Sequence, residues 1–164
     1  MKLSEVSQKS DSQFLIDGML GSLARKLRIL GFDAWYDSKS TDIQLLRSAK
    51  KTNRWLVTSD IELYFLAKRR GTKTILIRSR SQRDILFEVL SRIGLSQISN
   101  NRTARCSVCN GILADSGRMN KDEPILSCSD CGKDFWKGSH WKRMSKLFDD
   151  VNRLLMNKSQ KVGS

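Results

Sequence analysis

Short apolar segments alternate with helical stripes over residues 14–95. The run Phe14–Asp17 is apolar and ends in an acid, which predicts a buried strand. Leucines at helical spacing follow over residues 20–30, and Gly31 stands where a helix would end. Further strands are expected at 32–37, 55–58 and 74–77, and further helices at 42–51, 61–70 and 82–92. Strands that alternate with helices predict parallel β-α-β units in a three-layer α/β/α sandwich.

The helix expected from residue 42 carries both a start signal and an apolar side. Thr41 precedes it and is a favoured N-cap residue type. Ile43, Leu46 and Ala49 follow at spacings that place them on one face. We expect this face to pack on the sheet.

The pattern changes after residue 95. Residues 96–105 are polar and unpatterned, which indicates a linker. A polar turn is expected at 117–123 and a short strand after it, between Pro124 and Cys128. A basic amphipathic helix is expected at about 141–156, with a fraying end over 158–164. The chain is therefore divided into an α/β domain at 14–95, a small cysteine domain at 104–145, and a basic helix and tail at 146–164.

All four cysteines belong to one motif, C-x2-C-x18-C-x2-C, formed by Cys106, Cys109, Cys128 and Cys131. This spacing is typical of a four-cysteine zinc site. Four thiolates around Zn²⁺ leave no position for water, so the site is expected to be structural. Two disulfides are the alternative, which the lack of a secretory signal and of any other cysteine disfavours.

The chain is strongly basic, with 30 Lys and Arg against 17 Asp and Glu and a formal net charge of +13. Residues 1–100 hold 18 basic and 10 acidic side chains, and residues 101–164 hold 12 and 7, so the excess is spread along the chain. RNA, DNA and an anionic membrane are polyanions that fit such a charge, and a solvated basic surface is the alternative. No apolar run approaches the ~20 residues of a membrane span. We expect a soluble, cytoplasmic protein without a membrane partner.

Acidic residues stand where the predicted parallel strands end. Asp17, Asp37 and Asp60 occupy these positions, and the carboxyl ends of such strands are where ligand sites form. Carboxylates are the ligands that Mg²⁺ and Mn²⁺ prefer, and these cations can activate water for attack on phosphorus. We expect Asp17 and Asp60 to be the first ligands and Asp42 the third. Asp37 and Glu62 are expected to complete the cluster or to orient a water.

Each of these acids also has a purely structural interpretation. Asp42 can stabilise a helix N-terminus through the helix dipole. Asp60 can be the N-cap of the helix that starts at residue 61. Asp37 can end a strand in a solvated turn. The spacing alone leaves both interpretations open.

Basic and aromatic side chains supply candidate contacts to a nucleic acid. Trp136 and Trp141 can stack on bases, or can pack the cysteine domain against the larger one. His140 is the only histidine, which excludes nucleophilic sites that need a histidine elsewhere. The residues expected to bind RNA are Arg25, Arg47, Lys50, Lys137, His140, Trp141, Lys142 and Arg143.

Several motifs together resemble one known family. They are the stretches 14–21 and 23–33, the stretch 56–60 that ends in Ser-Asp, the turn 106–111, and Trp-Lys-Gly-Ser-His at 136–140. In this order they resemble the PIN-like ribonuclease family named for the C-terminal domain of the Mut-seven protein. The resemblance covers about residues 14–145.

The resemblance implies a PIN-like α/β/α domain followed by a zinc ribbon, and cleavage of RNA that depends on Mg²⁺ or Mn²⁺. Asp17 and Asp60 match the motif acids of the family, and Asp42 matches the acid that opens the following helix. We therefore expect an endoribonuclease with structural zinc.

Two other functions remain open. One is a PIN-like protein that binds ribosomal or other structured RNA without cleaving it, which the weakly acidic stretch 38–41 favours. The other is a DNA-binding zinc ribbon, which does not explain the acids at the strand ends. The sequence does not indicate an oligomeric state.

Overall fold

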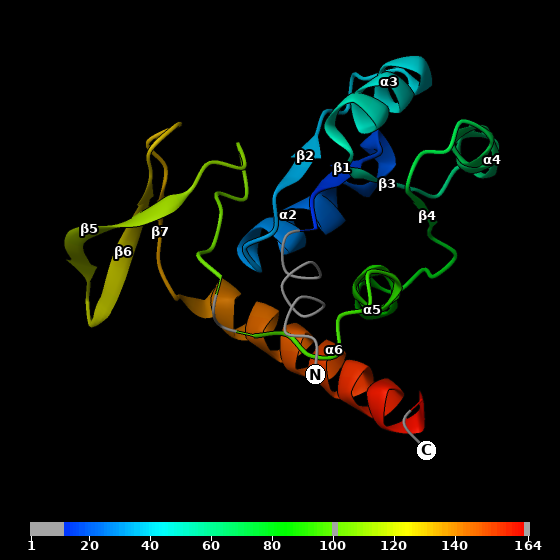
Figure 1. The fold of residues 1–164 in the computed structure, drawn as a ribbon. Coiled ribbons are helices and arrows are strands. Elements are labelled where there is room, and N and C mark those ends of the chain that lie inside the picture. The colour runs from blue at the N-terminus through cyan, green and yellow to red at the C-terminus, as the bar shows by residue number, and fades with distance from the viewer. Residues whose placement is uncertain (1–11, 100–101, 163–164) are drawn as a thin grey trace, which may run out of the picture.

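The computed structural model describes residues 12–99 and 102–162, which form two sheets and the helices around them (Figure 1). The elements of the first sheet's region are β1 (Phe14–Ile16), the 3₁₀ turn η1 (Gly18–Leu20), α2 (Gly21–Ile29), β2 (Ala34–Tyr36), α3 (Asp42–Thr52), β3 (Trp55–Thr58), α4 (Ile61–Arg69), β4 (Thr74–Leu76) and α5 (Gln82–Arg92). The remaining elements are β5 (Leu113–Asn120), β6 (Glu123–Cys128), β7 (Asp134–Phe135) and α6 (Ser139–Val162).

The larger sheet is parallel throughout and has the strand order β2-β1-β3-β4. Its central strand β1 pairs with β2 on one side and with β3 on the other, so Ile16 lies between Tyr36 and Val57. The α/β prediction is confirmed in every strand and helix of this region. Because β1 is central, the residue that follows it, Asp17, emerges in the middle of the sheet's carboxyl edge.

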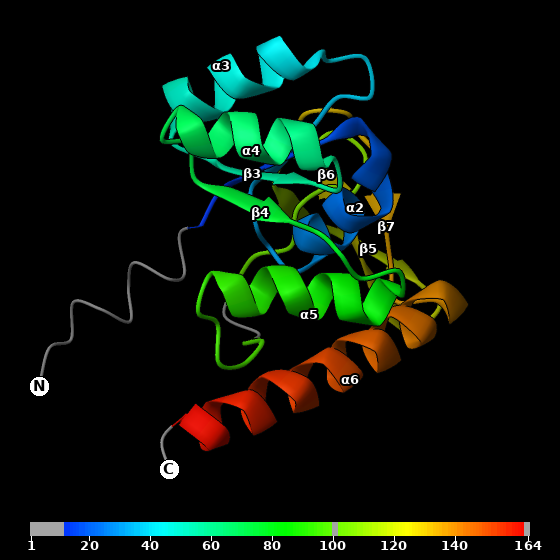
Figure 2. The same cartoon turned by 90° about the vertical axis from the view of Figure 1, so that its right-hand side faces the viewer.

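Helices cover both faces of this sheet, as Figure 2 shows. On one face, α3 and α4 bury a compact apolar cluster that includes Leu15, Leu46 and Leu63. On the other face, a larger cluster joins α2 and α5 to the C-terminal helix α6. Phe148, Val151 and Leu155 of α6 belong to this core and are at most 8% exposed. The last helix is therefore part of the fold of the α/β domain.

Local signals set several element ends. Thr41 caps α3 in a capping box with Gln44, as the sequence predicts for Thr41. Gly31 ends α2 at a φ of +84°, where a Cβ atom would also meet Arg102 at 2.4 Å. One helix-face prediction is wrong: Ile43 is 56% exposed. The buried residues of α3 are Leu45, Leu46 and Ala49, at positions i, i+1 and i+4 of one helix face, and Ile43 falls outside that face.

The cysteine domain is a three-stranded antiparallel sheet in the order β5-β6-β7. The polar turn expected at 117–123 is much shorter, because β5 continues to Asn120 through an irregularity between Asp115 and Arg118. Within this sheet, Arg118 Nη2 donates to both carboxylate oxygens of Asp134, at 2.8 Å each. Polar strand residues are possible here because most residues of β5 are exposed to solvent, while Leu113, Leu126 and Phe135 pack near the cysteines.

The expectation that the chain frays from Lys158 is also wrong within the described residues, because α6 continues to Val162. Leu155 is 1% exposed in the core, and the ammonium of Lys158 lies 6.0 Å above the ring of Phe87 in α5. Packing against α5 thus accompanies the continuation of α6 beyond the apolar stripe that the sequence predicts for it. None of the helices in the described residues is both long and apolar enough to cross a bilayer.

One buried arginine joins the two sheets. Arg28 of α2 is 4% exposed and donates from Nε to the carbonyl of Ala34 at 2.8 Å. Its Nη1 donates to the carbonyls of Ser107 and Val108, at 3.0 and 3.1 Å. These two residues lie in the first cysteine turn, defined here as residues 106–111. The guanidinium therefore fixes that turn against α2 and β2.

Asn110 forms a second link from the first cysteine turn. Its Nδ2 donates to Asp33 Oδ1 at 2.7 Å, and its Oδ1 accepts from the backbone of Ala34 at 3.1 Å. Arg54 Nη2 donates to the other oxygen of Asp33 at 2.8 Å. Burial raises the pKa of Asp33, but the hydrogen bonds from Arg54 and Asn110 outweigh it and hold the pKa below its ordinary value.

We expect the Arg28→Met variant to lower the free energy of unfolding by about 2–4 kcal/mol, because three backbone carbonyls, one buried and two partly buried, lose a charged donor. Arg28→Lys should recover little of this loss, since an ammonium lacks the forked geometry of a guanidinium. Urea denaturation followed by circular dichroism measures both values. A wild-type unfolding midpoint for Arg28→Met would contradict this role.

Candidate functional site

Two of the predicted acids are linked at the carboxyl edge of the parallel sheet. The hydroxyl of Thr58, the last residue of β3, donates to Asp17 Oδ2 at 2.7 Å. The same hydroxyl accepts from the backbone N–H of Asp60 at 2.9 Å. The Asp17 backbone N–H donates to the carbonyl of Val57 at 3.0 Å. The acids after two adjacent strands are thus tied to one fully buried threonine.

Asp60 is the N-cap of α4. Its Oδ1 accepts from the backbone N–H groups of Glu62 and Leu63, at 2.7 and 3.0 Å. The structural interpretation of this residue is therefore correct, but it does not exclude a ligand role. A carboxylate has two oxygens with about four lone-pair positions, and both cap bonds use one oxygen.

The other predicted acids lie on the elements around this edge. Asp37 follows β2, where Oδ1 accepts from the Lys39 backbone at 2.9 Å and Oδ2 from the Ser40 hydroxyl at 3.1 Å. These bonds form the strand-ending turn that its structural interpretation predicts. Asp42 is exposed in the first turn of α3, and Glu62 is exposed in the first turn of α4. Their roles in a cation site stay predictions.

The four cysteines come together as the spacing predicts. Cys106 Sγ lies 3.6 Å from Cys131 Sγ, and Cys109 Sγ lies 3.4 Å from Cys128 Sγ. All four sulfurs lie within 4.8 Å of one another and none forms a disulfide. A zinc tetrahedron with Zn–S bonds of about 2.3 Å has S···S edges of about 3.8 Å, which these distances approach. The cluster therefore has the composition and spacing of a structural zinc site.

Backbone amides around the cluster favour thiolates at some positions. The pKa of the Cys128 thiol is lowered to about 7, first by the backbone hydrogen bond from Cys131. At Cys109 the backbone of Gly111 also lowers the pKa, but desolvation and the neighbouring sulfurs outweigh it and raise the pKa to about 12. Four thiolates this close repel one another, and a divalent cation bound between them offsets that repulsion.

Within the described ranges 12–99 and 102–162, the cysteines are the one group of three or more His, Cys, Asp or Glu side chains spaced to share a metal ion. The strand-end acids do not form such a group. Asp17 and Asp60 are joined through Thr58, and Asp42 and Glu62 belong to neighbouring helices. The structure thus offers an acidic pair at the sheet edge, with further carboxylates on helices.

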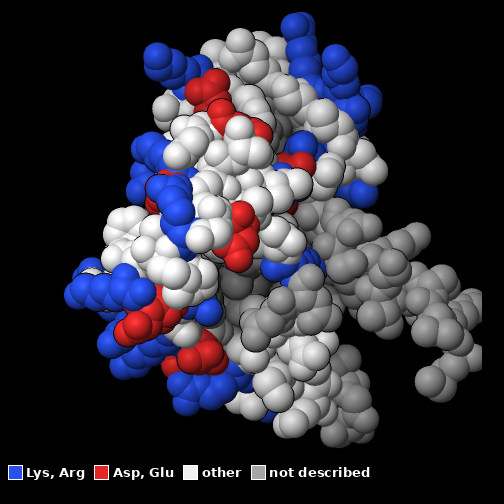
Figure 3. All heavy atoms as spheres, turned by 90° about the vertical axis from the view of Figure 1, so that its left-hand side faces the viewer, with Lys and Arg blue, Asp and Glu red and all other residues white. Residues whose placement is uncertain are grey.

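The predicted RNA-binding residues fall on two sides of the molecule. Arg47 and Lys50 lie on α3, across the sheet from α6. The others lie on α2 or near the start of α6, where Arg25 and His140 line one pocket and Lys137, His140 and Trp141 line its neighbour. Lys142 and Arg143 are exposed on α6. Figure 3, which faces the side of the cysteine domain, shows Lys and Arg along the left edge and at the upper right of the view, with acidic side chains among them.

Several residues at these sites are not apparent from the sequence. Thr58 reads as a strand residue, and only the contact between β1 and β3 shows that it positions an acid. Tyr36 donates a hydrogen bond to the carbonyl of Gly18 at 3.0 Å, next to Asp17, and lines the pocket with Arg25. The only available signal was their position at the ends of predicted strands.

A comparison with protein-family models identifies the chain. The model of the Mut7-C RNAse domain matches residues 12–148, which span the parallel sheet, the cysteine domain and the first part of α6. No curated protein and no solved structure gives a match.

A cation site at the sheet edge is a prediction of the sequence, and on that prediction Thr58→Val should weaken Mn²⁺ binding by about 10- to 100-fold, because the partner that orients Asp17 is lost. The free energy of unfolding should fall by about 1–3 kcal/mol, because the hydroxyl makes two hydrogen bonds, one to Asp17 and one from the Asp60 backbone. Thr58→Ser keeps the hydroxyl and serves as the control. Isothermal titration with Mn²⁺ checks this expectation, and equal affinities for the two variants would refute it.

We expect native mass spectrometry to find one Zn²⁺ per chain, and Cys128→Ser to abolish stoichiometric binding. Chelation should unfold the cysteine domain and remove hydrogen-exchange protection from β5 and β6, since metal binding supplies folding free energy. The parallel sheet has its own core and should keep its protection. Retained protection of β5 and β6 after zinc removal would show that the metal is not structural.

Proposed function

The chain belongs to the Mut7-C RNAse domain family, and we propose that it is an endoribonuclease that hydrolyses RNA phosphodiesters with bound Mg²⁺ or Mn²⁺. The observation that supports this most is the acidic pair Asp17 and Asp60 at the carboxyl edge of the parallel sheet, organised by Thr58. Ligand sites of open parallel sheets form at this edge.

The donor set fits a hard cation. Asp17 and Asp60 each commit one carboxylate oxygen to the protein fold in the bonds described above. Mg²⁺ keeps several waters and is held by as few as one or two carboxylates together with substrate phosphates. When bound, such a cation supplies the positive charge that activates water and stabilises the leaving oxygen. Two well-positioned carboxylates are therefore sufficient for the proposal.

The chain's own residues divide the remaining tasks. Thr58 fixes one carboxylate, and the N-terminus of α4 fixes the other through its cap hydrogen bonds. We assign Asp42 as a third ligand, and Asp37 and Glu62 as groups that orient water. Each of these is a carboxylate beside the same sheet edge.

Basic residues bind the substrate backbone in this proposal. Arg25 is nearest in the chain to the acidic edge, since α2 follows directly after Asp17 and η1. Lys142 and Arg143 extend the basic surface along α6, and Arg47 and Lys50 extend it along α3. Contacts of this kind hold phosphates without reading sequence. The net charge of +13 agrees with a polyanionic substrate.

A second candidate is an RNA-binding protein without cleavage activity. Two observations favour it: the strand-end acids do not form a group of three among the described residues, and the stretch 38–41 contains no acid. This candidate predicts salt-sensitive binding of structured RNA without turnover. The experiment below separates the two functions.

We expect the purified protein to cleave structured RNA with Mg²⁺ or Mn²⁺ and not with Ca²⁺ alone. Asp17→Asn and Asp60→Asn should each reduce the cleavage rate at least about a hundredfold, the scale of losing a group that stabilises charge in the transition state. Asp149→Asn changes an exposed acid on α6 and is the matched control. Gel analysis of end-labelled RNA measures the rates.

Wild-type cleavage by the Asp17→Asn variant would exclude this mechanism. Salt-sensitive binding by all the variants, with no cleavage by any of them, would establish the non-catalytic function.

A further inference from the structure

Two pockets open side by side where the α/β domain, the first cysteine turn and the start of α6 meet. They have volumes of about 410 Å³ and 540 Å³. Both are lined by Ile29, Ser107, His140 and Met144, so they adjoin each other, and the two together are called here the interdomain groove. Each of the two volumes lies in the range of pockets that enclose small molecules or single groups of larger ones.

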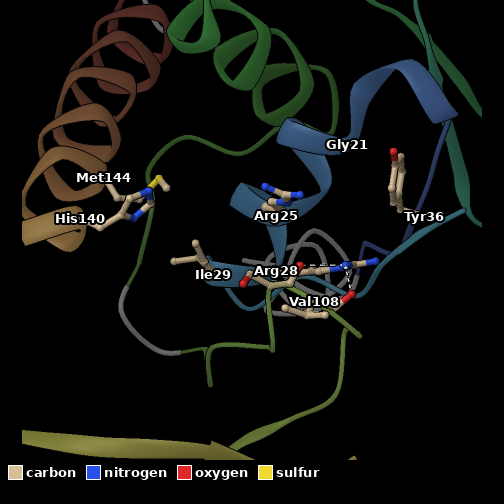
Figure 4. A pocket seen from close by; sticks show the side chains of 9 residues that line it. Gly21, Arg25, Arg28, Ile29, Tyr36, Val108, His140 and Met144 are labelled. Carbon is tan, nitrogen blue, oxygen red and sulfur yellow. Dashed lines mark hydrogen bonds between the residues drawn. The ribbon is translucent and has the colours of Figure 1, made fainter. Parts of the chain in front are cut away.

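One half of the interdomain groove presents cationic and hydrogen-bonding side chains among apolar ones. The exposed guanidinium of Arg25 and the ring of His140 line it from α2 and α6 (Figure 4). Tyr36 lines its other end, and the hydrogen bond from Tyr36 to Gly18 places that end next to Asp17. This half therefore begins beside the acidic edge and carries groups that bind a phosphate.

The other half is aromatic. Phe135, Trp136 and Trp141 line it together with Leu126 and Pro124. The ammonium of Lys137 lies 5.7 Å above the ring of Trp141. Flat aromatic surfaces with adjacent cations are the features on which proteins stack unpaired bases.

Packing between the domains accounts for only part of these aromatic side chains. Trp141 is half-buried, in agreement with a packing role, but Trp136 remains 51% exposed beside it. An exposed tryptophan at the mouth of an apolar pocket points to a ligand with a flat face.

We propose that the interdomain groove binds one unpaired nucleotide of single-stranded RNA. Its base lies against Trp136 and Trp141, and its phosphate contacts Arg25 and His140. The assignment of the ligand as RNA rests on the proposed function, because the half of the groove with Arg25 begins beside the acidic edge at which RNA would be cleaved. The bound nucleotide then flanks the phosphodiester that lies at Asp17 and Asp60, and RNA without an unpaired base at this position binds more weakly.

The test measures RNA binding by the full-length zinc-loaded chain in the Asp17→Asn background, so that cleavage does not interfere. Fluorescence anisotropy compares a labelled 12-nucleotide single strand with a duplex of the same sequence at one salt concentration. Trp136→Leu and Trp141→Leu should weaken binding of the single strand by about fivefold to a hundredfold, the effect of losing one stacked base. Duplex binding should not change.

Trp35→Leu is the matched control, because Trp35 is 40% exposed on β2 and does not line the groove. Its affinities for both RNAs should equal those of the parent. Unchanged single-strand affinity in both groove variants would overturn the proposal. An equal loss for single strand and duplex would also overturn it, since stacking on an unpaired base discriminates between them.

Photocrosslinking covers the case in which a groove variant does not fold. The Asp17→Asn protein is crosslinked to single-stranded RNA that carries 5-iodouridine, and the site is mapped by mass spectrometry. Crosslinks at Trp136 or Trp141 support the groove, and crosslinks confined to other residues refute it. Cleavage by the unmodified protein is measured separately, so tryptophan-dependent binding without cleavage would refute the nuclease and keep the groove.

Discussion

The buried guanidinium of Arg28 is the interaction on which the arrangement of this molecule depends. A charge this far from solvent is unfavourable unless it is hydrogen-bonded, and three backbone carbonyls from β2 and the first cysteine turn satisfy it. Desolvation lowers the pKa of Arg28, while the nearby Cys106 and Cys109 raise it. An arginine stays charged under such conditions because its ordinary pKa is so high. The cysteine cluster and the α/β domain thus stabilise each other electrostatically as well as sterically.

The cysteine domain is fixed at both of its ends. Arg28 and Asn110 hold its first turn, and its last strand leads directly into α6, whose Phe148, Val151 and Leu155 are part of the main core. A domain tied at one end can swing on its linker, whereas a domain tied at two ends has little freedom to do so. The groove between α2 and α6 is therefore a feature of the folded core, and its two halves keep a constant relation to the acidic edge.

In the α/β domain, periodicity was sufficient to predict the elements and insufficient to predict the contacts between them. The strand at 55–58 and the helix at 82–92 occur at the predicted residues, because an apolar run marks the strand and Ser81 caps the helix. Ile43 was assigned to the wrong face, because a stripe on a short helix does not determine which turn meets the sheet. Arg28 lies in a helix among other basic residues, and no local pattern distinguishes the buried cation from the exposed Arg25. Thr58 acquires its role only when β1 and β3 become neighbours.

The electrostatics of the cysteine cluster explain why cations surround it. Zn²⁺ with four thiolates carries two negative charges, which would repel RNA phosphates nearby. Arg28 is hydrogen-bonded to the first cysteine turn and offsets part of this negative charge. Arg105 also contacts this turn, through a hydrogen bond to the carbonyl of Asn110 at 2.9 Å. Arg25 does not take part in this neutralisation and lines the groove. A zinc ribbon of this kind acts by positioning side chains, since it holds Trp136 and His140 opposite α2. The carboxylates of the sheet edge lie in a separate environment, where the proposed cleavage would use a hard cation and oxygen ligands.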